Sequence, residues 1–577
     1  MAQIHFEIFR QQGKGTSWSL VEAQDKRDVA MARAKELLAS GQAGAVRVVK
    51  ETLNEATGDY MSLTVLEEGE VNTKKKKKGD GDAENPLPCF KPDDLYSYHA
   101  RSTISRPVGE WLSRQRLTVS ELLHSAAALE KFEATGTTYQ HAVQKIAVAG
   151  AADSEMPVQQ IVKSLNDLCN NAIQRVYRDE KKGVFPTLTA EQFAGFVERL
   201  GDRADGSYLL GGALAKYLAP AKGWDANLQL LLALMPLLPA QGPARGLLLS
   251  GIDTIIAELL NGAAALADLL GPSGNLGHAL FNLTQLFLGQ PVDTAEGTGT
   301  GINHLANYFA KDDLPNGRAA IADRILTELR SMKRLSPANL EEELKTLRKL
   351  ANQLVRGQGK YLSNEDLIGA FTDRSKRMVT QEPILQFLQP CKTADEKIER
   401  LLVIEENIIG AGNKRTLAGF IIPLLQSSSF EEQLAVGAPA LQRMKRTADL
   451  QQRVLRSGLQ EPQRGQIAQG LDVVALRIEA RAGVLASLES RVANPAERAQ
   501  AILRLCTGGV LTQGELMNKA RRLLLATLAK PGFFANYLSQ ATKDKEGVDK
   551  AQVMSDLAAQ LGRAGIDPQE GLRVLAA

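Results

Sequence analysis

The pattern of apolar residues changes at residues 73–92. Before this segment apolar residues alternate as they do in strands, and after it they recur every three or four residues, as in helices. Consecutive lysines stand at Lys74, Lys75, Lys76, Lys77 and Lys78, and glycines and prolines follow them. Because lysines repel one another, glycine adds backbone freedom and proline lacks an amide donor, the segment is expected to be a linker. The sequence therefore predicts a small α+β head tethered to a large helical body.

The chain of 577 residues is too long for one hydrophobic core, since single cores stop growing near about 250–300 residues. The predicted fold class is predominantly all-α, an irregular bundle or solenoid with a coiled helical hairpin and a small N-terminal domain. The predicted domains are the α+β head 1–72, the disordered linker 73–92, a helical bundle 93–205, an apolar helical block 206–291, a helical region 302–428, and the coiled hairpin with C-terminal helices 429–577.

The head contains two predicted hairpins on either side of one helix. Alternation over residues 4–9 and 18–22 predicts the first hairpin, and residues 46–50 and 60–66 predict the second. Between them the apolar spacing predicts a helix over 29–39, with Asp25 or Asp28 as its N-cap. The resulting order ββαββ gives a four-stranded sheet covered by a helix.

Helix-start signals recur through the body. In such a capping box, a Ser or Thr and a Glu or Gln three residues later satisfy each other's first-turn amides. Asparagine or aspartate followed by proline is an alternative start signal, because the proline lacks only a donor that the first turn leaves unpaired. These signals are Thr118/Glu121, Thr189/Gln192, Thr393/Glu396, Ser429/Glu432, Thr512/Glu515, Asn494–Pro495 and Asp567–Pro568. Each precedes an apolar run at helical spacing, and this predicts an all-α body.

Residues 429–492 approach a heptad repeat. The expected seam of a two-helix hairpin consists of Leu434, Leu441, Ala448, Leu455, Leu471, Ile478, Leu485 and Val492, joined by Met444, Val474 and Leu488. Residues 441–530 hold 15 Lys and Arg against 7 Asp and Glu, a net charge of +8. The off-seam residues Arg443, Arg446, Arg453 and Arg456 form a candidate partner face. Because guanidinium groups bind carboxylates bidentately, we expect an acidic protein surface or a second copy of the chain as partner.

The composition of the chain indicates its cellular compartment and the class of partner that it binds. The formal net charge of +3 gives no global argument for nucleic acid, so nucleic-acid binding is possible but not favoured. The four cysteines are widely spaced, which fits free thiols in a reducing cytoplasm. The most apolar window, 228–240, is shorter than the roughly 20 residues that a membrane span needs. We therefore expect a cytoplasmic protein without a membrane span.

One glycine-rich segment is a candidate anion contact. Gly410, Gly412, Lys414, Arg415 and Thr416 offer backbone amides, cations and a hydroxyl at a helix start, a combination that can surround an anion. The spacing is not that of a P-loop and no strand is predicted before it. A glycine that ends one helix before a basic helix start explains the pattern equally.

The sequence contains no recognisable catalytic, metal-binding or cofactor motif. His124 and His141 lack the spacing of metal ligands, and His124 is expected to be exposed on a capped helix. The favoured function is a non-enzymatic regulatory or scaffold protein that acts through protein–protein contacts. One alternative is an enzyme whose site is assembled from separated helices, near Gly410–Thr416 or His124. The other is a binder of nucleic acid or anionic membrane that uses the linker lysines and the basic helices.

Overall fold

The computed structural model describes residues 4–11, 18–53, 60–69, 89, 91–153, 156–201, 203–293, 300–427, 429–542 and 550–569. The predicted linker lies largely outside these residues, and so do all five lysines of its run. Contacts divide the chain into two compact units. Unit 1 is Met1–Ala221 with Leu237–Glu258, and unit 2 is Lys222–Pro236 with Leu259–Ala577. The finer division into six parts stays a prediction.

The head has the predicted ββαββ order. Its elements are β1 (Ile4–Gln11), β2 (Ser19–Gln24), α1 (Arg27–Ala39), β3 (Ala45–Leu53) and β4 (Tyr60–Gly69). The sheet is antiparallel throughout, with strand order β2-β1-β3-β4.

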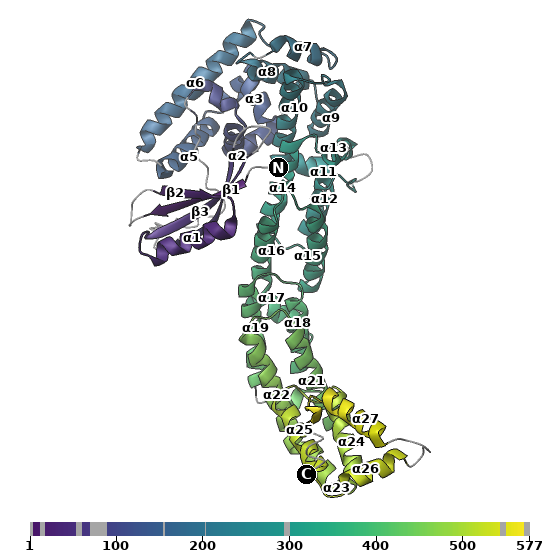
Figure 1. Ribbon diagram of the computed structural model, residues 1–577. Coiled ribbons are helices and arrows are strands. Elements are labelled where there is room, and N and C mark those ends of the chain that lie inside the picture. The colour runs from purple at the N-terminus through teal and green to yellow at the C-terminus, as the bar shows by residue number, and fades with distance from the viewer. Residues whose placement is uncertain are drawn as a thin grey trace. The chain divides into compact units, whose positions relative to one another are not determined.

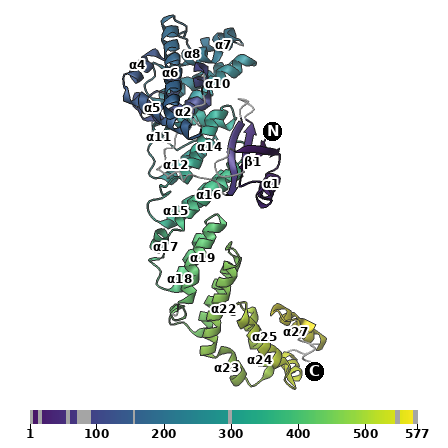
Figure 2. The ribbon, with the colours of Figure 1, turned by 90° about the vertical axis from the view of Figure 1, so that its left-hand side faces the viewer.

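The helix α1 covers one face of this sheet (Figures 1 and 2). Phe6 and Ile8 alternate along β1, so both point to the face on which α1 packs, and Ala34 and Leu37 of α1 meet them there. The predicted N-cap is wrong, because the N-cap position is Lys26 and its side chain makes no capping hydrogen bond.

Unit 1 continues as a helical body (Figure 1). Its elements are η1 (Pro92–Tyr96), α2 (Tyr98–Gln115), α3 (Val119–His124), α4 (Ala126–Glu133), α5 (Thr137–Asp153), α6 (Val158–Lys181), α7 (Gln192–Leu200), α8 (Gly206–Leu218) and α10 (Pro243–Asn261) as far as Glu258. The predicted capping box at the start of α3 is confirmed: the Thr118 and Glu121 side chains each bond the other's backbone amide.

Unit 2 consists of helices only, among the residues that the structure describes. They are α9 (Trp224–Leu234), η2 (Met235–Leu237), α11 (Ala263–Leu270), α12 (Leu276–Phe287), α13 (Thr300–Ala310), α14 (Pro315–Arg330), α15 (Leu340–Leu354), η3 (Val355–Gly357), α16 (Asn364–Met378), α17 (Gln381–Leu388), α18 (Ala394–Glu405), α19 (Ala411–Gln426), α20 (Phe430–Gln433), α21 (Ala440–Arg456), α22 (Gln463–Ala482), α23 (Val484–Arg491), α24 (Pro495–Thr507), α25 (Glu515–Leu528), α26 (Phe533–Thr542) and α27 (Lys550–Arg563). The last residue of η2 lies beyond the unit boundary.

Within unit 2, helices close in sequence pack side by side. Contacts join α12 to α14, α14 to α16, α18 to α19, α19 to α22 and α22 to α25 in turn. Figure 2 shows α18, α19 and α22 following one another in this way. Each helix therefore buries its apolar stripe against near neighbours, as in helical solenoids. The fold is predominantly all-α with a small N-terminal α+β domain, as predicted.

The predicted helical hairpin is formed by α21 and α22, which fold back on one another. Its predicted seam is partly wrong in the first helix: Met444 and Ala448 are buried as predicted, but Leu441 is 46% exposed and Leu455 is 36% exposed. The buried stripe of α21 follows the straight-helix period, and it also includes Gln451 and Val454. The second predicted helix also ends early, because Gly483 adopts a left-handed conformation and separates α22 from α23.

Two predicted helix-start signals in the C-terminal part have different outcomes. Asn494 caps α24, since its side chain accepts a hydrogen bond from the amide of Ala496, and Pro495 occupies the first turn. The predicted capping box of α25 is wrong. Thr512 lies before the helix and donates its hydroxyl to Asp472 of α22, whose carboxylate accepts the first amides of α25.

Among the described residues, no single helix is both long and apolar enough to cross a membrane. Taken together, α10 and α11 are long and apolar enough, but the two helices are sharply bent at the break between them.

Candidate functional site

A polar cavity of about 710 Å³ opens between helices of unit 2. Its walls come from α15, α18, α19, α21 and the residues that follow α21. Four cationic side chains line it: Arg348, Lys414, Arg453 and Arg456. We call this space the basic cavity. The structure thus brings together Lys414 from the predicted anion contact and two arginines from the predicted partner face, while Arg348 was not identified from the sequence.

The basic cavity also contains carboxylates. Glu405, Glu406 and Asp449 line it, so four cations face three anions and the formal charge of the wall is +1. Lys414 is bound to Glu405, with 2.5 Å between Nζ and Oε1. Arg453 is bound to Glu406, with 3.0 Å between the guanidinium and Oε1.

Two cationic side chains of the basic cavity are available to bind a ligand. Arg348 and Arg456 are exposed, and neither forms an ion pair or hydrogen bond with any residue that the structure describes. They reach the cavity from α15 and α21, helices that lie about a hundred residues apart in the sequence. Two exposed guanidinium groups that line the same concave space provide bidentate sites for carboxylates.

Gly458 leaves room for an ion pair on the wall of the basic cavity. A Cβ at this position would clash with Nζ of Lys414 and would lie 3.0 Å from Oε1 of Glu405. The Glu405 side chain is only 2% exposed, so it has little room to move aside. The glycine therefore leaves the space that the Lys414–Glu405 pair occupies.

The remaining residues of the predicted anion contact do not converge. Gly410 has φ of +100° and stands just before α19, which fits the alternative interpretation as a glycine between two helices. Thr416 donates its hydroxyl to the carbonyl of Gly412 within the same helix. Arg415 is exposed on α19 and does not line the basic cavity.

Two residues of the predicted partner face make internal contacts. Arg446 binds the carboxylates of Asp395 at 2.9 Å and Glu399 at 2.7 Å, both on α18. Arg443 donates to the backbone carbonyls of Glu431 and Leu434. These contacts hold α21 to its neighbours. Partner binding by this face stays a prediction, and Arg453 and Arg456 are the members that reach the basic cavity.

His124, in unit 1, is not exposed as expected. It is 3% exposed, its Nδ1 lies 2.7 Å from the carbonyl oxygen of Ser120, and Tyr96 and Tyr208 pack on its ring. A Cβ on Gly211 would clash with the same ring. Burial lowers the pKa of His124 from 6.5 to about 4, so the ring is neutral near pH 7.

Two further carboxyl groups are buried in unit 1, one on α3 and one on α10. Burial raises the pKa of Glu121 from 4.5 to about 7, and it also raises the pKa of Glu258. Glu258 accepts hydrogen bonds at 2.9 Å from the amide and the hydroxyl of Ser120, and lies 3.2 Å from Arg101. This network joins α10 to α2 and α3 within unit 1.

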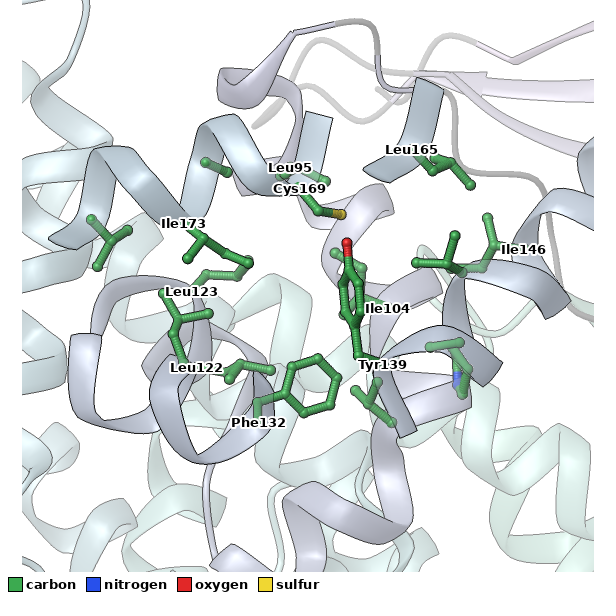
Figure 3. A pocket seen from close by; sticks show the side chains of 17 residues that line it. Leu95, Ile104, Leu122, Leu123, Phe132, Tyr139, Ile146, Leu165, Cys169 and Ile173 are labelled. Carbon is green, nitrogen blue, oxygen red and sulfur yellow. The ribbon is translucent and has the colours of Figure 1, made fainter. Parts of the chain in front are cut away.

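An apolar cavity of about 80 Å³ lies among η1 and α2–α6 of unit 1. Figure 3 shows aliphatic side chains of several helices around it, with the hydroxyl of Tyr139 directed toward Cys169. Apart from Tyr139 and Cys169, the lining residues are aliphatic, proline or phenylalanine. The sequence did not reveal this space, because its lining residues have the ordinary spacing of helical core positions.

Within the part of the chain that the structure describes, no group of three or more His, Cys, Asp or Glu side chains could hold a metal ion. All four cysteines are free thiols.

Comparison with known proteins assigns neither a family nor a function to the chain. The chain matches no model of a protein family, no curated protein and no solved structure.

Proposed function

We propose that this chain is a non-enzymatic regulatory or scaffold protein whose unit 2 binds an acidic segment of a partner protein in the basic cavity. The observation that carries the proposal is the convergence of four cations from three helices. Two of these cations, Arg348 and Arg456, pair with no residue that the structure describes. Arrays of packed helices commonly present such concave surfaces to extended partners.

The mixed charge of the cavity favours a peptide over a nucleic acid. Affinity for nucleic acid grows with the number of phosphates that cations neutralise. A wall with a formal charge of +1 neutralises few of them, so it gains little from the closely spaced phosphates of a nucleic acid. An acidic peptide places single carboxylates on Arg348 and Arg456, and its amide groups can donate to Glu406 or Asp449.

The proposal is tested by titrating the full chain into a fluorescein-labelled Glu-rich peptide and measuring fluorescence anisotropy. Arg348→Ala and Arg456→Ala should each weaken binding about tenfold, which corresponds to ~1.4 kcal/mol. The matched control is Arg415→Ala, which removes an exposed arginine that does not line the cavity, and its affinity should equal that of the wild type.

Two results would overturn the proposal. An equal loss of affinity in the Arg415→Ala control would show that the peptide senses overall charge and no particular site. Tighter binding of a single-stranded oligonucleotide than of the peptide, weakened by the same two substitutions, would assign the cavity to nucleic acid.

A further inference from the structure

We propose that the apolar cavity of unit 1 is a binding site for the alkyl chain of a small amphiphile, such as an acyl or alkyl ligand. This site lies among η1 and α2–α6 and shares no residue with the basic cavity. The inference therefore does not depend on the function proposed for unit 2.

The chemistry of the wall selects an apolar ligand. Ile104, Leu122, Phe132, Ile146 and Leu165 are among the residues that face the cavity, and no side chain with a formal charge lines it (Figure 3). Water in such a space would lack hydrogen-bond partners, and apolar cavities of this kind stay dry and accept apolar molecules.

The two polar groups on the wall do not call for a charged ligand. The Tyr139 hydroxyl already donates to Oδ1 of Asn166 at 3.0 Å. Burial raises the pKa of the Cys169 thiol to about 11, so this group is neutral near pH 7. The charged or polar end of a ligand must accordingly stay outside the cavity, which is partly open to the surface.

The size of the cavity limits how much of a ligand it can hold. An engineered apolar cavity of about 150 Å³ admits benzene. The cavity here is about half as large, at about 80 Å³, so it holds only the terminal carbons of an alkyl chain, and the rest of the chain leaves through the opening. Because the walls belong to six elements, a bound chain would contact most of this part of unit 1 at once.

The experiment uses 1-heptanol as the probe and the full chain as the protein, with binding measured by isothermal titration calorimetry. Ala172→Leu on α6 and Ala142→Leu on α5 each place a larger side chain in the cavity, because both alanines are buried and line it. Each variant should bind 1-heptanol at least tenfold more weakly than the wild type. The control Ala127→Leu makes the same change at an exposed position of α4 and should bind as the wild type does.

Circular dichroism and thermal melting establish whether each variant is folded. If the wild type does not bind 1-heptanol, or if a folded Ala172→Leu or Ala142→Leu variant binds it unchanged, the proposal is overturned. Unfolding of both variants would also overturn it, because it would show that the walls enclose no free volume.

Discussion

Replacing Asp472 by alanine tests how the C-terminal helices of unit 2 are held together. Asp472 is a buried residue of α22, and its carboxylate accepts three hydrogen bonds, one from Thr512 and two from the first amides of α25. The donors are the Thr512 hydroxyl at 2.6 Å, the Glu515 amide at 2.6 Å and the Leu516 amide at 3.3 Å. Gly514 is needed beside it, because a Cβ there would clash with the carboxylate.

The expected cost of Asp472→Ala is about 3–5 kcal/mol in the free energy of unfolding. A hydrogen bond to a charged group contributes roughly 1.5–3 kcal/mol, and the longest of the three is expected to contribute least. The substitution also leaves the Thr512 hydroxyl buried without an acceptor and removes the only side chain that caps α25 among the described residues.

The assay is urea denaturation followed by circular dichroism, combined with hydrogen exchange of the amides in α25. The first-turn amides of α25 should exchange faster in the variant before the rest of the helix does. The control Asp449→Ala removes an exposed aspartate of α21, and its unfolding free energy should change by less than about 0.5 kcal/mol. If Asp472→Ala costs no more than this control, the carboxylate does not support α25 and the reasoning is refuted.

Two further predictions concern stability. His124 has a lowered pKa, so its contribution is lost as the pH falls from 6.5 to about 4, whereas Glu121 has a raised pKa, so its contribution is lost as the pH rises from 4.5 to about 7. Relative to the wild type, His124→Gln should therefore lose more stability at pH 7 than at pH 4.5, and Glu121→Gln should lose more at pH 4.5 than at pH 7, with a difference between the two pH values of up to ~3 kcal/mol in each case. Urea midpoints measured at both pH values check this, and a loss of stability that does not change with pH in either variant would contradict it. In the α21–α22 hairpin, Ile478→Ala should lower the free energy of unfolding by about 2–5 kcal/mol because the side chain is buried. Leu441→Ala should lower it by less than about 1 kcal/mol because the side chain is exposed. A lower melting temperature for Leu441→Ala than for Ile478→Ala would contradict this assignment of buried positions.

The sequence predicted elements better than it predicted contacts between them. The patterns that predicted the elements depend only on residues that are close in the sequence. Apolar residues at every second position identified the strands of the head, and those at a period of 3.6 identified the helices. The capping pair of Thr118 and Glu121 identified the start of α3. The heptad reading of Leu441 and Leu455 failed, because a helix packed among several neighbours follows the straight-helix period. The start of α25 was misassigned since its cap, Asp472, lies 43 residues before Glu515.

The candidate sites depend on neighbours that are distant in the sequence. Arg348 reaches the basic cavity from α15, and nothing in its local sequence distinguishes it from other exposed arginines. Arg446 is paired with carboxylates about 50 residues earlier on α18, so a basic stripe along α21 alone could not show that it is already bound. The burial of His124 likewise results from Gly211 and Tyr208 of α8, which no local pattern connects to α3.

The central claim is that the basic cavity is where a partner's acidic segment binds, and a hydrogen-exchange footprint tests it most directly. Exchange of the full chain is compared with and without a saturating Glu-rich peptide. The account predicts protection at the cavity end of α21 and the residues after it, 449–458, and in the turn from α18 into α19, 402–414. Protection confined to other helices, or none in these two segments at saturation, would contradict it.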